Sequence, residues 1–321
     1  MSNSWSLASA NLTSVAVLVF VLGFIGARIK SDVRIPEPIY QMISIYLLFG
    51  IGLKGGHALK SVTADSFVKP ALATLALGIA IPTMAFFVLK LIRKLNDMDR
   101  GAIAAHYGST SLVTFSAALL YLDNSKIHVE GFATALLTLL EIPGVVVGVY
   151  LGSRKLQQEV QWGKTLLEVL TGKTVLLLVG GLAIGATTTQ GGFLKVTPFF
   201  IDLQSGFLAL FLLHLGYLAG SNWGEIRKVG ASVALFGIIF PIAAGALGVS
   251  VGHWVGLSIG GATILGVLCA SGSYIAAPAA VSVGLPKANA SLALMSSIGV
   301  TFPFNLIVGI PLYLEIAKAF N

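Results

Sequence analysis

The chain has 321 residues, of which 56% are hydrophobic and only 10% are charged, and its formal net charge is +7. Typical globular domains are about 25% charged, so this composition argues against a soluble enzyme, a disordered chain and a nucleic-acid-binding module. The single cysteine, Cys269, also argues against a disulfide scaffold, and the class that remains is a membrane protein with many spans.

Ten apolar stretches are each long enough to cross the hydrocarbon core of a bilayer, which takes about 20 helical residues. The connections between them are short, and none is long enough for a soluble domain. The sequence therefore predicts an all-α polytopic membrane protein with ten transmembrane helices. In chain order the stretches cover residues 11–29, 37–53, 69–92, 99–122, 129–152, 164–187, 198–220, 227–250, 255–283 and 288–317.

The basic residues predict which ends of these stretches face the cytoplasm, because lysine and arginine collect in cytoplasmic loops. The odd-numbered connections carry thirteen of them, whereas the even-numbered connections and the chain ends carry six. We expect the odd-numbered connections in the cytoplasm, both termini outside, and a multi-pass protein of the inner (plasma) membrane. Lys173 lies inside the sixth stretch, where we expect it to snorkel or to pair with Glu168.

The two halves of the chain share a pattern at an offset of 164 residues. The motif IGLKGG, Ile51 to Gly56, corresponds to LGYLAG, Leu215 to Gly220. Each half holds five spans, so the two copies lie in opposite orientations, as in the inverted repeats of secondary transporters. The alternative is chance recurrence among 37 glycines. The predicted organisation is a first repeat over 1–152, a short cytoplasmic linker over 153–163 and a second repeat over 164–321.

Two stretches carry small and hydroxyl-bearing residues that interrupt the helical pattern. The fourth contains AAHYGSTSLVTFSAAL, Ala104 to Leu119, and the ninth contains CASGSYIAAPAA, Cys269 to Ala280. Glycine and proline weaken a helix, and unwound backbone at membrane depth occurs only where it is buried in protein or lines a cavity. A Gly-Ser pair lies at the repeat offset in the two runs, Gly108-Ser109 and Gly272-Ser273.

An interrupted helix offers the chemistry that a carrier of small ions needs. The N-terminus of its second half exposes N–H groups and a positive dipole end, which attract an anion. Released carbonyl oxygens and hydroxyl oxygens coordinate a cation such as sodium. Two breaks that cross near the midplane can therefore hold an anion and a cation together. The alternative is close helix packing through small residues.

Besides Lys173, the predicted spans carry Glu141, His106 and His214 at interior positions. Glu141 is in the middle of the fifth, where a charge costs about 2.5–3.5 kcal/mol on insertion scales. We favour a sodium ligand or a proton-binding carboxylate over a hydrogen bond between helices. For His106 and His214 we favour a neutral ring bonded to a neighbouring helix over a proton relay.

Motifs along nearly the whole chain resemble the sodium-dependent bicarbonate transporter family, the SbtA-like permeases known from cyanobacteria. IGLKGG resembles the family's IGLTGG, and Asn124 to Val146 aligns without gaps to a segment centred on ESKIS and DIPALV. GEIRK, from Gly224, resembles GELRK, and ASGSYIAAP, Ala270 to Pro278, aligns with ASSSDISGP. GLPKANAS, from Gly284, resembles GIPSANPS.

The resemblance implies a 5+5 inverted repeat with a gate and a core region, a homotrimer, and inward transport of bicarbonate coupled to sodium. It also implies no cofactor, and it brings in a PII-like regulatory protein as a partner known for the family. We expect contacts with the anion from Gly108, Ser109, Thr110, Ser111, Ser271, Gly272, Ser273 and Tyr274. We expect sodium ligands from Ser111, Thr114, Glu141 and Ser273.

The chain departs from the family at the second break. Tyr274 stands where the family has aspartate, which removes a carboxylate that could help to bind sodium, and Gly272 replaces a serine. The alternatives to bicarbonate and sodium are therefore another small anion and coupling to protons. The linker over 153–163 is also shorter than in cyanobacterial members, so docking of a PII-like protein is not assumed here.

A membrane-embedded enzyme is a distant alternative. A serine hydrolase needs a base beside its nucleophile, and the spacing of Ser111 and His106 permits such a pair. However, the sequence carries no zinc motif, triad order or phosphate-binding loop with lysine. We therefore expect a transporter and not an enzyme.

Overall fold

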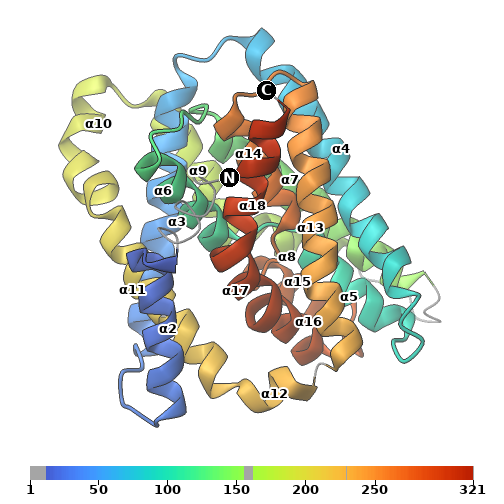
Figure 1. The fold of residues 1–321 in the computed structure, drawn as a ribbon. Coiled ribbons are helices and arrows are strands. Elements are labelled where there is room, and N and C mark those ends of the chain that lie inside the picture. The colour runs from blue at the N-terminus through green and yellow to red at the C-terminus, as the bar shows by residue number, and fades with distance from the viewer. Residues whose placement is uncertain (1–11, 155–161, 229, 321) are drawn as a thin grey trace.

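The computed structural model describes residues 12–154, 162–228 and 230–320, and within these ranges it contains helices and no strand. The long helices run alongside one another (Figure 1). The first half of the chain forms α2 (Val15–Arg28), α3 (Glu37–Leu59), α4 (Ala64–Leu89), α5 (Asp97–Gly108), α6 (Leu112–Asn124) and α7 (Ala133–Ser153).

The second half is divided into more segments, and three π-helical turns, η1 to η3, separate some of its α-helices. Its first elements are α8 (Trp162–Thr171), α9 (Lys173–Thr187), α10 (Gln190–Thr197), η1 (Pro198–Asp202), α11 (Gln204–Ser221), α12 (Trp223–Lys228) and α13 (Ala231–Trp254). Its last elements are α14 (Ile259–Ala270), α15 (Ala276–Gly284), α16 (Ala290–Ser296), η2 (Ser297–Thr301), α17 (Phe302–Phe304), η3 (Asn305–Gly309) and α18 (Ile310–Ala319).

Six of the described helices are long and apolar enough to cross a membrane, or seven if the bent pair α8 and α9 is one span. All ten predicted stretches fall on described helices, but α2 and α14 are short and the fourth stretch is divided between α5 and α6. The count of ten therefore stays a prediction. The predicted linker over 153–163 lies mostly on residues 155–161, outside the described residues.

Large apolar side chains point outward from several helices. In a soluble protein, apolar patches of this kind mark a binding surface, whereas a membrane-spanning helix presents them to lipid. The side chains with more than half of their surface exposed include Leu18, Leu22, Leu72, Ile79, Leu176 and Ile239. This arrangement and the apolar helices make the chain a multi-pass membrane protein.

By their contacts the helices fall into two groups, which we name the gate bundle (α2, α3, α9 and α11) and the core bundle. In Figure 1, α2, α3 and α11 lie on the left, and α4, α5 and α13 lie on the right. In the gate bundle α2 packs along α11, and α3 packs along α9. In the core bundle, which comprises α4 to α7 and α13 to α18, α5 packs with α4 and α7, and α14 packs with α13 and α18. Both broken helices, α5–α6 and α14–α15, belong to the core bundle.

Glycines of the two repeated motifs form the closest helix contacts of the gate bundle. A Cβ added at Gly56 of α3 would overlap the carbonyl of Leu182 on α9. A Cβ added at Gly216 of α11 would overlap the carbonyl of Phe20 on α2. The backbones approach this closely because no side chain separates them. Each motif thus packs against the first predicted span of the other half, which is α2 in the first half and the bent pair α8 and α9 in the second.

Hydrogen bonds between the two halves also fix both ends of the core bundle. The N–H of Ser258, which precedes α14, donates to Glu130 Oε1 at 2.6 Å, and the Ser258 hydroxyl donates to Oε2 at 3.1 Å. The N–H of Asn289, which precedes α16, donates at 2.7 Å to Asp99 Oδ1 in the first turn of α5. The start of each broken helix is therefore held by a loop from the opposite half.

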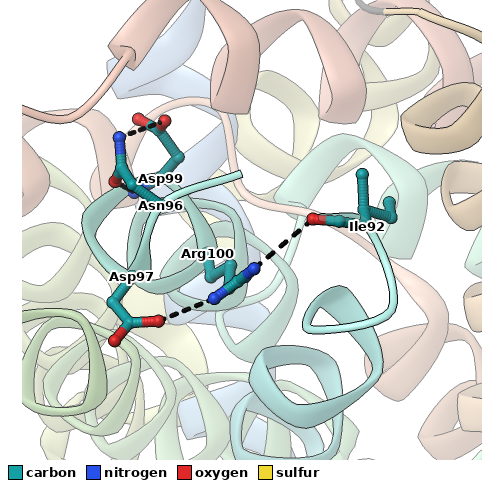
Figure 2. A network of polar contacts seen from close by, with 5 residues as sticks. All are labelled: Ile92, Asn96, Asp97, Asp99 and Arg100. Carbon is teal, nitrogen blue, oxygen red and sulfur yellow. Dashed lines mark hydrogen bonds and ion pairs between the residues drawn. The ribbon is translucent and has the colours of Figure 1, made fainter. Parts of the chain in front are cut away.

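A polar network fixes the start of α5 (Figure 2). Asn96 caps the helix: its Oδ1 accepts the N–H of Asp99 at 2.8 Å, and its Nδ2 donates to the Asp99 carboxylate at 2.7 Å. Arg100 donates to Asp97 at 2.7 Å and to the carbonyl of Ile92 at 3.4 Å. The two aspartates place negative charge at the positive end of the helix dipole, which stabilises it.

We predict that Gly185→Ala destabilises the protein by about 1–3 kcal/mol, the usual range for overpacking. A Cβ at Gly185 on α9 would overlap the carbonyl of Leu53, whereas a Cβ at Gly180 on the same helix meets nothing within 4 Å. Gly180→Ala is the matched control, and we expect it to be neutral or stabilising by up to about 1 kcal/mol because alanine favours helix.

The single cysteine supplies the measurement, because Cys269 is buried. A thiol-reactive fluorescent dye added to detergent-purified protein therefore reports unfolding with temperature. Equal melting midpoints for the two alanine variants would contradict the close approach of α3 and α9.

Candidate functional site

The two broken helices are built alike but differ in the length of the break. The first half-helices, α5 and α14, each have 12 residues and end at the C-cap residues Ser109 and Ser271, 162 positions apart. The second halves begin after Ser111 and Ile275, 164 positions apart. The second break is thus two residues longer. The offset is 162 over the first half-helices, and it is 164 at the glycine motifs and at the start of the second half-helices.

The two breaks hydrogen-bond to each other. The N–H of Ser111 donates to Ser271 Oγ at 3.0 Å, and the N–H of Ser273 donates to the carbonyl of His106 at 2.7 Å. His106 Nδ1 lies 2.6 Å from the carbonyl oxygen of Ser273. Because a carbonyl only accepts, Nδ1 carries the proton. His106 therefore holds the second break in place, in line with the expected bond to a neighbouring helix.

Serine side chains cap the second half-helices. Ser111 Oγ accepts the N–H of Thr114 at 3.2 Å and its hydroxyl at 2.9 Å, and donates to Tyr274 Oη at 3.1 Å. Ser273 Oγ accepts the N–H groups of Ala276 and Ala277, both at 3.3 Å. A serine hydroxyl donates once and accepts twice, so Ser111 has no free capacity in this conformation.

A small cavity lies between the breaks. Its volume is about 10 Å³, roughly the space that one water molecule or a bare ion needs. Five of the predicted site residues line it: Thr110, Ser111, Glu141, Ser273 and Tyr274. Leu112, Ile275 and Thr174 complete the lining. The structure thus brings hydroxyls of both breaks and the carboxyl group of α7 to one point.

The other predicted site residues do not line this cavity. Gly108 and Gly272 are contact points, because a Cβ at Gly108 would lie 2.6 Å from Pro82 and a Cβ at Gly272 would lie 2.8 Å from Ser297. Ser109, Thr114 and Ser271 lie in or beside the breaks, and all three are buried. The hydroxyl of Ser109 has no hydrogen-bond partner among the described residues.

Glu141 is the carboxyl group nearest the crossing. It is only 2% exposed, two residues before Pro143 in the middle of α7. Thr110 Oγ1 lies 3.5 Å from Glu141 Oε2. Within the described ranges no lysine, arginine or histidine forms an ion pair with it. A buried carboxyl group without a cationic partner is suited to bind a cation or a proton.

Sequence reasoning missed two residues around the crossing, Thr174 and Asn305. Thr174 enters the cavity from α9 because the sixth stretch bends by 51° at Gly172. The signal was present as a glycine followed by Lys173 and a threonine inside an apolar run. Asn305 comes from a π-helical turn and donates at 2.8 Å to the carbonyl of Ala270, at the end of α14. No sequence pattern indicated that turn.

Two larger cavities lie toward opposite ends of the boundary between the bundles. One, of about 290 Å³, is lined by Gln41 near the start of α3, and by Glu141 and Tyr274 of the crossing. The other, of about 530 Å³, is lined by Lys54 near the end of α3, and by Asp123. Gln41 and Lys54 are about 20 Å apart along the helix at 1.5 Å per residue. The first cavity reaches the crossing and the second ends short of it.

Comparison with known proteins identifies a related family. A family model described as the Na+-dependent bicarbonate transporter superfamily matches residues 15–318. No curated protein matches the chain at a significant level. The matched range includes both broken helices and Glu141, so the resemblance that the motifs indicate is confirmed at the level of the family.

We predict that Ser271→Ala destabilises the protein by about 1–3 kcal/mol, because it leaves the buried N–H of Ser111 without its acceptor. Ser116→Ala is the control. Its hydroxyl is also buried but bonds only to the carbonyl of Leu112 in its own helix. Thermal unfolding measures both variants, and a neutral Ser271→Ala would mean that the breaks are not held by this bond.

Proposed function

The chain belongs to the Na+-dependent bicarbonate transporter superfamily, and from this premise we propose that it is a secondary active transporter that imports bicarbonate together with sodium. The observation that carries the proposal is the crossing of two broken helices around a small cavity lined by hydroxyls and Glu141. Broken helices at the bilayer midplane form the ion and substrate sites of secondary transporters.

The proposed architecture is ten spans in a 5+5 inverted repeat, with 1–152 and 164–321 as the two copies. The exchanged contacts support it. Each glycine motif packs on the first predicted span of the other half. The hydrogen bonds between Ser258 and Glu130 have a counterpart in the bond from Asn289 to Asp99. A twofold axis in the membrane plane relates pairs of contacts in this way.

In the proposed site, sodium occupies the cavity between the breaks. Its ligands are oxygens of Thr110, Ser273 and Glu141, and Thr174 adds a hydroxyl from the gate bundle. Ser111 Oγ contributes only after one of the two bonds that it accepts opens. Ser273 Oγ also accepts two bonds, so Ser273 contributes its carbonyl oxygen. Thr114 Oγ1 only donates to Ser111 and keeps its lone pairs, but Thr114 does not line the cavity. The anion faces the N-termini of α6 and α15, whose positive dipole ends point toward the breaks. Glu141 takes over the role of the carboxylate that Tyr274 replaces.

We propose that transport proceeds by alternating access, in which the core bundle moves against the gate bundle and carries the crossing with it. The cavities at the two ends of the bundle boundary are then the inner and outer approaches. If the odd-numbered connections are cytoplasmic and the termini outside the plasma membrane, the cavity beside Gln41 opens inward. This cavity shares Glu141 and Tyr274 with the crossing, so the conformation is inward-facing.

Two other functions find less support. In the membrane-enzyme alternative Ser111 needs a base, but its hydroxyl donates to Tyr274, and His106 Nδ1 is directed to the carbonyl of Ser273. A proton-coupled carrier differs from the proposal only in that Glu141 binds a proton in place of sodium. The dependence of transport on sodium or on a proton gradient distinguishes the two.

We predict uptake of labelled bicarbonate into proteoliposomes under an inward sodium gradient, and no uptake when potassium replaces sodium. Glu141→Gln should reduce the sodium-driven rate by roughly tenfold or more, because a neutral amide replaces the charged ligand at the site. Glu225→Gln makes the same change in an exposed ion pair with Lys228, and we expect it to leave the rate unchanged.

The outcomes separate the alternatives. Uptake driven equally by potassium, but dependent on a proton gradient and on Glu141, would favour the proton-coupled carrier. Normal sodium-driven uptake by the double variant Ser111→Ala, Ser273→Ala would contradict the placement of the site at the crossing.

A further inference from the structure

A lysine faces the cavity that leads to the crossing. Lys173 is the first residue of α9, directly after the bend at Gly172, and it is partly buried. It lines the cavity of about 290 Å³ together with Glu141 and Tyr274. This volume is several times the roughly 30 Å³ of one water molecule in the liquid, so it accommodates a small oxyanion with part of its hydration shell.

The positive charge of Lys173 is not neutralised directly. Its Nζ donates to Gln41 Oε1 at 2.5 Å, and no described carboxylate lies within 4.0 Å of it. Of the two expectations for Lys173, the pairing with Glu168 is not found among the described ion pairs, and snorkelling stays a prediction. Gln41 Nε2 in turn donates to Glu37 Oε1 at 2.5 Å, so Glu37 reaches the lysine only through a neutral amide. A partly buried ammonium group is costly unless an anion compensates it.

We propose that Lys173 is the specificity-determining residue for the anion, and that its ammonium group binds a small monovalent oxyanion in this cavity. The inference rests on the proposed function and adds a residue that the resemblance does not assign. The lysine stands at the start of α9, whose positive dipole end adds to its field. The bend at Gly172 places it on the path to the crossing, because Thr174, one residue on, lines the small cavity.

The other groups that face the cavity define the alternatives. Glu168 lies on α8, on the far side of the bend, and Glu141 lies at the inner end. Tyr40 and Gln41 of α3 contribute neutral polar groups. If Glu168 were the counter-ion of Lys173, the lysine would stabilise the bend and bind no anion.

The test uses the full-length chain in detergent and sodium bicarbonate as the ligand, with sodium chloride at equal ionic strength as the reference. Ligand-induced stabilisation of the thermal midpoint gives an apparent dissociation constant. We expect Lys173→Gln to weaken bicarbonate binding by roughly tenfold or more. Lys173→Arg keeps the charge and should stay within about threefold, as should Gln41→Ala, which removes only the neutral partner.

Lys195→Gln is the matched control, because Lys195 is an exposed lysine on α10 and does not line the cavity. Unchanged binding by Lys173→Gln, with normal binding by the wild type, overturns the inference and leaves the proposed function standing. An equal loss in Glu168→Gln also overturns it, because the lysine then acts through the bend.

The wild type alone tests the proposed function. The wild type could bind nitrate but not bicarbonate, and Lys173→Gln could lose nitrate binding. This result would support the anion site at Lys173 and would contradict bicarbonate as the substrate. If the wild type is stabilised by neither anion, both proposals fail.

Discussion

The backbone groups released by a buried helix break must find partners within the protein, and this constraint governs the centre of the molecule. An unsatisfied N–H or C=O in the hydrocarbon region costs several kcal/mol. Here each break supplies what the other lacks: Ser271 accepts the N–H of Ser111, and His106 accepts the N–H of Ser273. Asn305 satisfies the carbonyl at the end of α14. Each break therefore satisfies backbone groups of the other, and residues of both line the cavity.

Tyr274 takes part in this pairing. Its hydroxyl oxygen accepts a hydrogen bond from the Ser111 hydroxyl. Its ring packs edge-on against Phe302, with 5.7 Å between the ring centroids. A carboxylate at this position would face the same serine with a full negative charge. The phenol fills the position with a neutral group, and the remaining carboxyl group of the cavity comes from α7 through Glu141. The carboxyl group at the crossing thus comes from a continuous helix.

The sequence predicted most of the helices and part of the site, for physical reasons that differ from residue to residue. Length and apolarity locate a helix because the bilayer sets both, and all ten stretches fall on helices. Hydroxyls and a glycine located the breaks around Gly108 and Gly272, because such residues are unusual within an apolar span. The bend at Gly172 was missed because one glycine in a membrane helix is ordinary, and the partner of Lys173 lies 132 residues away. Contacts over such distances depend on packing, and no local pattern encodes them.

The ties between the halves have a consequence for synthesis. The hydrogen bond that Asp99 accepts cannot form until Asn289 has been synthesised, 190 residues later in the chain. At about 5–20 residues per second, this separation corresponds to roughly 10–40 s of translation. During that time the first half is inserted in the membrane while the start of α5 lacks this partner. Insertion of the individual helices must therefore precede closure of the core, as a two-stage order of assembly requires, and the last helices to leave the ribosome complete the first broken one.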